Sequence, residues 1–196
     1  MVKGKTFFIV PGFRQQSTDR EYQWLRTLLK ASGFSVIPVP IVWERRTMDD
    51  YCADFESTYK KYKTQENYIL GFSYGAVIAF LTAQTLGPKK IFLCSLSPDF
   101  KEDVSAMSSA MQKYIGKSRV AHSRRTSAKA VAKELTVPSV VFCGEVEGKK
   151  YPQLMTRCRE TVQIAARSKL VMVERAPHRI DFPAYQMAIT EEIKDL

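Results

Sequence analysis

The sequence predicts one three-layer α/β domain built on a doubly wound, mostly parallel sheet of about six strands. Short apolar runs alternate along the 196 residues with helix-compatible stretches. The apolar runs show little alternation between apolar and polar positions, which is typical of strands covered on both faces of a parallel sheet. The chain is 45% hydrophobic and contains neither a low-complexity linker nor an internal repeat. Residues 1–196 are therefore expected to share a single core.

The predicted elements alternate between strand and helix. The expected strands are residues 5–10, 34–42, 67–72, 90–96, 138–143 and 169–173. The expected helices are residues 18–31, 48–63, 74–86, 152–167 and 183–194, with one or two more within 101–135. Pro38 and Pro40 favour an edge position for the second strand, and Thr47 is expected to cap the helix that follows it. Ligands of such sheets bind beyond the carboxyl ends of the strands, so the residues just after each strand matter most.

The third predicted strand leads into the most informative motif of the chain. Residues 71–75 read Gly-Phe-Ser-Tyr-Gly, a G-x-S-x-G pattern between an apolar run and a helix-compatible stretch that stops at Gly87. Strand, tight turn and helix form the context of a nucleophile elbow, in which the serine is strained and its hydroxyl is exposed above the sheet. Glycine two residues to either side avoids a clash in the crowded turn. The alternative is an ordinary strand-to-helix turn that contains a serine.

Polar residues also follow the other predicted strands. They are Pro11-Gly12-Phe13-Arg14 after the first, Ser97-Pro98-Asp99 after the fourth, Gly144-Glu145-Val146-Glu147 after the fifth and Pro177-His178 after the sixth. A serine, then an acid, then a histidine on one rim is the order of the triad in α/β-hydrolases. On the elbow and the trailing histidine, the chain resembles a small α/β-hydrolase-fold serine hydrolase over nearly its whole length. It looks like the compact bacterial type without a large cap domain.

By this resemblance, Ser73 is the nucleophile and His178 the general base. Imidazole titrates close enough to neutrality to accept and return a proton. The only other histidine, His122, lies in a basic stretch at a position that the family does not use for catalysis. Many family members have glycine, two residues and then aspartate after the corresponding strand, and this spacing gives Glu147. Asp99 and Glu145 remain alternatives for the acid, and all three carboxylates could instead be solvated loop residues.

The loop after the first strand is expected to complete the site. The backbone N–H of Tyr74 and, by resemblance, that of Phe13 form the oxyanion hole. The family often has His-Gly where this chain has Pro11 and Gly12. Gly12 and Arg14 are expected to contact substrate, and Arg14 could hold a carboxylate or phosphate by a bidentate contact. The alternative for Arg14 is an exposed or structurally paired side chain.

Composition limits the other function classes. The net charge is +10, and part of the excess lies within residues 113–133. This segment could attract anions or nucleic acid, but it contains a single aromatic, Tyr114, and no nucleic-acid motif accompanies it. The four cysteines show no C-x-x-C spacing, so a reduced, cytoplasmic protein is expected. No metal-ligand spacing, cofactor motif or membrane span is recognised.

The function expected from these residues is that of a serine hydrolase of the carboxylesterase type. Its partner is a small-molecule acyl substrate, an ester, thioester or amide, cleaved through an acyl-enzyme on Ser73. Residues 97–135 are expected to form a short basic flap where relatives insert a cap, which leaves a shallow site for small acyl groups. The alternative is a non-catalytic binding or scaffold protein with the same fold. The sequence names neither the substrate nor the oligomeric state.

Overall fold

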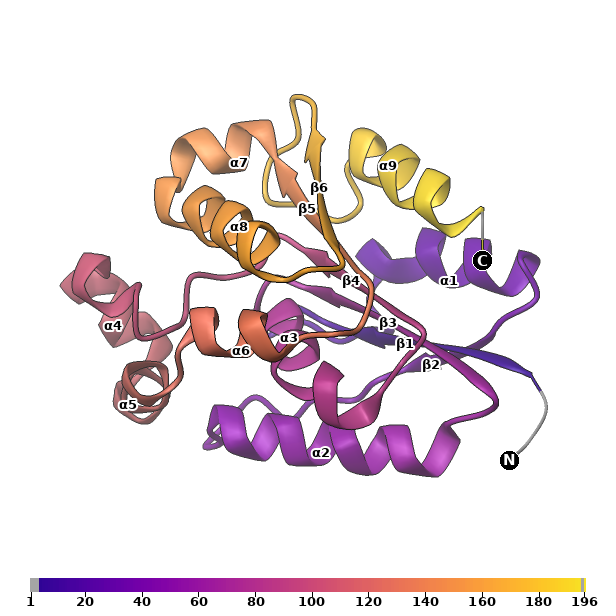
Figure 1. The fold of residues 1–196 in the computed structure, drawn as a ribbon, viewed down its shortest axis with the longest axis horizontal. Coiled ribbons are helices and arrows are strands. Elements are labelled where there is room, and N and C mark those ends of the chain that lie inside the picture. Colours follow the sequence, from indigo (N-terminus) through magenta and orange to yellow (C-terminus); the bar gives the residue numbers. More distant parts are fainter. Residues whose placement is uncertain (1–3, 195) are drawn as a thin grey trace.

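A computed structural model describes residues 4–194 and 196, and a six-stranded, wholly parallel sheet forms its centre (Figure 1). The strand order is β2-β1-β3-β4-β5-β6. The strands are β1 Lys5–Val10, β2 Ser35–Pro38, β3 Glu66–Phe72, β4 Lys90–Cys94, β5 Ser139–Gly144 and β6 Ser168–Val173. The chain leaves β1 toward β2 and returns on the other side with β3, so the strand order reverses between β1 and β3. Ligand sites of open parallel sheets lie beyond the strand ends at such a reversal. The parallel six-stranded sheet confirms the expected fold class.

Two helical layers cover the sheet (Figure 1). Successive residues of β1 point into opposite layers: Phe7 packs with Tyr22 and Leu25, whereas Phe8 packs with Phe55. The first layer contains α1 Gln23–Ala31, preceded by the 3-10 turn η1 Arg20–Tyr22, and α9 Pro183–Ile193. The second contains α2 Met48–Tyr62, α3 Tyr74–Leu86, α6 Ala128–Glu134 and α8 Pro152–Ile164. Because both faces of the sheet are buried, its central strands carry continuous apolar runs.

Two local expectations about the second strand and its helix are confirmed, and one is corrected. β2 is an edge strand, and Thr47 caps α2, since its hydroxyl accepts from the backbone N–H of Asp50 at 3.4 Å. The strand itself covers only Ser35–Pro38 instead of residues 34–42. Val39 still donates to Ile9, but Pro40 has no N–H and cannot extend the ladder.

The chain between β4 and β5 contains more helices than the sequence predicted. Besides α6, it forms a 3-10 turn η2 Val104–Ala106 and the helices α4 Ser109–Ile115 and α5 Lys117–Arg125, which lie to the left in Figure 1. Gly116, at φ 93°, separates α4 from α5. Ser108 caps α4 through the N–H of Met111, and Ser127 caps α6 in the same way. A further short helix, α7 Glu145–Lys150, begins directly at the end of β5, where the sequence indicated only a loop.

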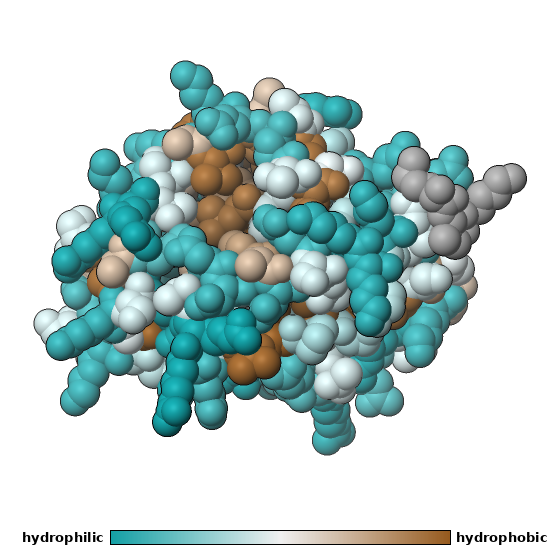
Figure 2. Space-filling model, turned by 90° about the horizontal axis from the view of Figure 1, so that it is seen from below, coloured by the Kyte–Doolittle hydropathy of each residue, from teal (hydrophilic) through white to brown (hydrophobic). Residues whose placement is uncertain are grey.

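The outer face drawn in Figure 2 is largely hydrophilic, and the cysteines form no disulfide within the described residues. Hydrophilic side chains cover most of the face drawn in Figure 2, and hydrophobic ones gather in a smaller area. Cys94 and Cys143 are buried in strands, and all four cysteines of the chain are free thiols. Among the described helices, none combines the length and the hydropathy that crossing a membrane requires.

Candidate active site

Ser73 occupies a strained turn between β3 and α3. Its backbone has φ 54° and ψ −114°, a conformation that side chains with a Cβ rarely adopt and that costs about 1–3 kcal/mol. The turn is also crowded. A Cβ on Gly71 would lie 2.3 Å from the carbonyl oxygen of Gly75, and one on Gly75 would lie 2.3 Å from that of Val10. Only glycine therefore fits on either side of this serine.

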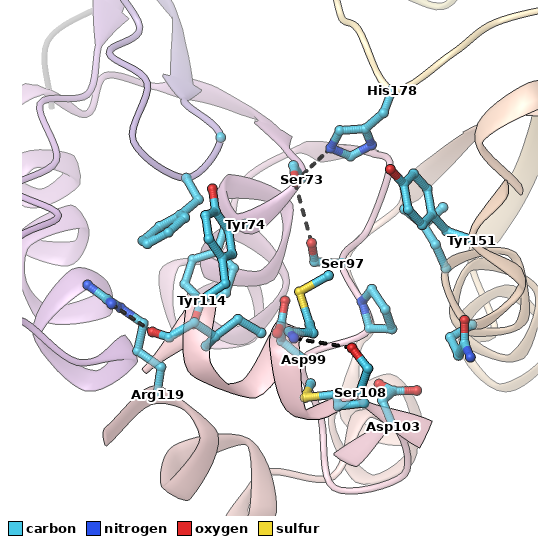
Figure 3. A pocket seen from close by; sticks show the side chains of 18 of the residues that line it. Ser73, Tyr74, Ser97, Asp99, Asp103, Ser108, Tyr114, Arg119, Tyr151 and His178 are labelled. Carbon is cyan, nitrogen blue, oxygen red and sulfur yellow. Dashed lines mark hydrogen bonds between the residues drawn. The ribbon is translucent and has the colours of Figure 1, made fainter. Parts of the chain in front are cut away.

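His178 reaches Ser73 from the loop after β6. Its Nε2 lies 3.0 Å from Ser73 Oγ, as Figure 3 shows, and its ring packs on Phe72 with 4.9 Å between centroids. The loop is fixed on the end of β5, where the carbonyl of Ala176 accepts from the N–H groups of residues 146 and 147. A Cβ on Gly144 would lie 2.4 Å from this same carbonyl oxygen, so the loop depends on glycine at that position.

Glu147 holds the other nitrogen of His178. Its Oε2 lies 2.7 Å from Nδ1, and its side chain is fully buried in the first turn of α7. The other oxygen, Oε1, accepts from the N–H of Gly144 at 2.5 Å, from Ser95 Oγ at 2.8 Å and from the hydroxyl of Tyr185. Burial and the neighbouring carboxylate raise the pKa of Tyr185, which keeps its hydroxyl protonated and donating. These donors replace water around a carboxylate that burial would otherwise destabilise.

The two alternative acids lie elsewhere. Glu145 is on the surface, where it accepts from Lys149 Nζ at 2.7 Å and from the backbone N–H of Arg175 at 3.2 Å. Asp99 is buried in the wall of the pocket, and burial, helped by the charge of Asp103, raises its pKa to about 7. Neither carboxylate is bonded to His178. Of the three acids that the sequence left open, the structure brings Glu147 to the histidine.

His122, the other histidine, also lies apart from Ser73. Its Nδ1 is 3.2 Å from a carboxylate oxygen of Asp49, and its Nε2 is 2.9 Å from Thr126 Oγ1. It is buried within α5 and does not line the pocket around Ser73. Within the described part of the chain, no group of three His, Cys, Asp or Glu side chains could hold a metal ion.

Two backbone N–H groups near Ser73, those of Phe13 and Tyr74, are the ones that the sequence assigned to the oxyanion hole. Phe13 follows β1, and Tyr74 is the first residue of α3, where the helix dipole adds partial positive charge. Within residues 4–194 and 196, neither N–H donates to a protein acceptor. The N–H of Gly12 is already used, since it donates to the hydroxyl of Tyr22 at 2.9 Å. The rings of Phe13 and Tyr74 pack against each other at 5.5 Å.

A largely apolar pocket of about 650 Å³ opens in front of Ser73. In Figure 3, Tyr114 lies beside Tyr74 on one side, Tyr151 stands on the other, and Ser97 lies below Ser73 with 3.4 Å between the two hydroxyl oxygens. The wall opposite the sheet comes from the segment after β4, through Met107, Met111, Tyr114 and Ile115. The sequence does not single out these side chains, because their apolar spacing does not separate a pocket wall from a core.

Arg14 lies beside this pocket and not in its lining. Its guanidinium carbon is 5.2 Å from the ring centroids of both Phe13 and Tyr114. Gly12 does line the pocket, and a Cβ there would lie 2.5 Å from Gln15 Oε1.

Sheet, helical layers and elbow together define an α/β-hydrolase-fold protein, and the comparisons with solved structures agree. Est1E from Butyrivibrio proteoclasticus superposes with a TM-score of 0.80 at 16% identity, over 98% of this chain and 86% of that one. Alpha/beta hydrolase domain-containing protein 10 from mouse gives 0.78 at 14%, over 99% and 90%. MenH from S. aureus gives 0.71 at 15%, over 99% and 95%. No protein-family model matches the sequence, and no curated protein sequence matches it significantly.

Proposed function

We propose that this chain is a serine hydrolase that cleaves a small ester, thioester or amide through an acyl-enzyme on Ser73. The observation that carries the proposal is the continuous hydrogen-bonded line Ser73–His178–Glu147, with 3.0 Å and 2.7 Å between its members, on a strained elbow. A carboxylate can only accept, so Nδ1 of His178 carries the proton between ring and acid. Nε2 is then left to accept the proton of Ser73.

In the first step, Ser73 Oγ attacks the carbonyl carbon of the substrate while His178 Nε2 takes the hydroxyl proton. The carbonyl oxygen gains negative charge, and the N–H groups of Phe13 and Tyr74 donate to it. Glu147 stabilises the imidazolium that forms. The tetrahedral intermediate collapses when His178 returns the proton to the leaving oxygen, sulfur or nitrogen, and the acyl group stays on Ser73.

In the second step, water replaces the leaving group. His178 removes a proton from the water as its oxygen attacks the acyl carbon, and the same two N–H groups hold the oxyanion. Collapse of this intermediate returns the proton to Ser73 Oγ and releases the carboxylic acid. The buried donors around Glu147 keep the acid in place through both steps, because none of them is exchanged for water.

The pocket suggests which part of the substrate lies where. Its apolar wall, with Met107, Met111 and Ile115, favours an acyl group of small to medium size, and 650 Å³ lies within the range of small-molecule sites. Est1E, one of the similar structures, holds ferulic acid, a carboxylic acid and thus the product class of ester cleavage. We propose that residues 97–135 serve as a short cap, with α4 over the acyl group.

A fluorophosphonate probe tests the proposal, because it phosphonylates only a serine that a neighbouring base activates. We expect one adduct, mapped by mass spectrometry to Ser73, and its loss in Ser73→Ala and His178→Ala. The substitution Ser32→Ala, at an exposed serine after α1, serves as the matched control and should leave labelling intact. An adduct on Ser97, or none on folded protein, contradicts the mechanism, and the second result favours a binding or scaffold role.

A further inference from the structure

A second hollow lies beside the catalytic pocket, and guanidinium groups dominate it. The groove measures about 790 Å³ and shares two lining residues, Phe13 and Arg119, with the pocket around Ser73. Its other lining residues are Arg14, Gln16, Ile41, Val42, Trp43, Glu44 and Arg45. Among the described lining residues, three arginines therefore face a single carboxylate, that of Glu44. The groove and the pocket around Ser73 therefore adjoin at Phe13 and Arg119.

Two of the three guanidinium groups are free to bind. Arg119 is engaged, since it donates to Ile115 O at 2.9 Å and to Tyr51 OH at 3.0 Å. Arg14 and Arg45 are exposed, and within the described chain neither forms an ion pair. The neighbouring Arg46, by contrast, is paired with Asp54 at 3.1 Å.

Both arginines have uncommon backbone conformations, and aromatic rings position the side chain of Arg14. Arg14 has φ 63° and Arg45 has φ 54°, values uncommon for residues with a Cβ and enriched at active sites and ligand clamps. The guanidinium of Arg14 also stacks over Phe13 and Tyr114 at 5.2 Å from each ring centroid. Stacking restricts the side chain beforehand, so binding costs less rotamer entropy.

We propose that this groove binds an anionic group, a phosphate or a carboxylate, carried by the substrate whose acyl carbon lies at Ser73. The inference rests on the proposed hydrolase function and narrows its substrate class to anionic esters or thioesters. Guanidinium presents two parallel donors that match the oxygens of either anion. The apolar pocket then receives the acyl group, and Arg14 and Arg45 hold the charged end of the molecule.

Three butyryl thioesters with the same reacting bond test the proposal. N-acetylcysteamine gives a neutral leaving group, 3-mercaptopropionate adds a carboxylate, and coenzyme A adds phosphates. We expect kcat/KM for at least one anionic thioester to exceed that for the neutral one about tenfold at low salt. The preference should shrink toward one as the salt approaches about 0.5 M, because exposed charges are screened. The expected tenfold preference corresponds to about 1.4 kcal/mol. If, at low salt, kcat/KM for neither anionic thioester exceeds that for the neutral one by more than about twofold, the proposal is overturned.

Variants separate the groove from the overall charge. Arg14→Gln and Arg45→Gln should each lower the anionic-to-neutral ratio of kcat/KM about fivefold. The control is Arg159→Gln, an exposed arginine of α8 outside both hollows, which removes the same charge and should leave the ratio unchanged. Equal ratios in all variants overturn the assignment. If one of the two groove variants fails to fold, the other tests the assignment against Arg159→Gln.

A binding experiment distinguishes failure of the groove from failure of the hydrolase mechanism. Coenzyme A and glutarate are titrated into the Ser73→Ala protein by calorimetry, with and without Arg45→Gln. If no thioester is cleaved but one anion binds and loses about fivefold affinity in the double variant, the mechanism is wrong and the groove stands. If the thioesters are cleaved without preference and neither anion binds, the groove is wrong and the mechanism stands.

Discussion

Replacing Glu147 by glutamine changes the charge of the acid while keeping its shape. Oε1 receives hydrogen bonds from Gly144, Ser95 and Tyr185, so these donors fix the amide oxygen of the introduced glutamine at the same place. The amide NH₂ must then face Nδ1 of His178, 2.7 Å from the acid in the parent protein. Because the NH₂ donates, Nδ1 has to accept, and the ring proton moves to Nε2. His178 can then no longer accept the proton of Ser73.

The magnitude follows from this tautomer change. An inverted tautomer in a serine hydrolase lowers kcat by up to about ten-thousand-fold, so Glu147→Gln should lower kcat about a thousand- to ten-thousand-fold. That loss equals about 4–5.5 kcal/mol of transition-state stabilisation. Glutamine is preferable to alanine, which would also leave three buried donors unpaired at about 1–3 kcal/mol each and confuse catalysis with folding.

The assay is the hydrolysis of a p-nitrophenyl ester by the parent, Glu147→Gln and Glu145→Gln. Glu145 lies two residues away on the surface, so its variant is the matched control and should keep its activity within about threefold. Circular dichroism and thermal unfolding establish that both variants fold. If folded Glu147→Gln keeps more than about a tenth of the parent kcat, the reasoning about the tautomer is wrong.

Three further predictions concern stability. The carboxyl of Asp99 has a pKa of 3.8 in the unfolded chain and of about 7 in the folded protein, so between these pH values the folded protein keeps a proton that the unfolded chain has released. The parent protein therefore loses stability as the pH rises from about 4 to 7, and Asp99→Asn does not. Urea unfolding should show a difference between the two that grows to about 4 kcal/mol, because about 3 pH units contribute about 1.4 kcal/mol each. In the parent protein the guanidinium of Arg157 lies 2.7 Å from the buried carboxylate of Asp103. Arg157→Met leaves this carboxylate without its ion pair and should lower stability by about 3–5 kcal/mol in the same assay. Gly75→Ala places a Cβ 2.3 Å from Val10 O and should cost about 3 kcal/mol or more, measured by thermal unfolding.

Each of these predictions has an internal control. A stability difference for Asp99→Asn that stays flat between pH 4 and 7 contradicts the raised pKa. Arg159→Met, on the exposed side of the same helix as Arg157, should change stability by less than about 0.5 kcal/mol. The Cβ introduced by Gly33→Ala would meet no other atom, but the residue would keep a φ of 83°, so the substitution should lower stability by about 1–2 kcal/mol. An equal loss of stability in Gly33→Ala and Gly75→Ala argues against the clash with Val10 O.

The sequence predicts the sheet well because its signals are local. Continuous apolar runs mark strands with two buried faces, and proline marks the edge strand. The elbow is only partly local, since the crowding at Gly71 arises within the turn, whereas a Cβ on Gly75 would meet the carbonyl oxygen of Val10 at the end of β1. The spacing from Gly144 also leads to the acid that the structure places at His178, because α7 starts at the strand end and turns residue 147 inward.

The remaining features depend on contacts between distant segments. Ser95 and Tyr185 lie 52 and 38 residues from Glu147, and a tyrosine on the buried face of a helix has the same sequence pattern as a core residue. The groove is equally hidden, since Arg119 joins Trp43 across 76 residues. The break between α4 and α5 comes from Gly116, and α6 begins at the cap of Ser127; both are weaker signals than an apolar run.

The hydrogen bonds on Oε1 of Glu147 make the geometry of the candidate active site depend on the tertiary structure. Ser95 follows β4, Gly144 ends β5, and Tyr185 belongs to α9, so two neighbouring strands and the last helix together position one oxygen atom. A small slip of any of them would rotate the carboxylate and misalign the histidine. On heating, the rate of ester hydrolysis should therefore fall at a lower temperature than the helical content does. An ester assay would then report whether α9 is packed against the sheet.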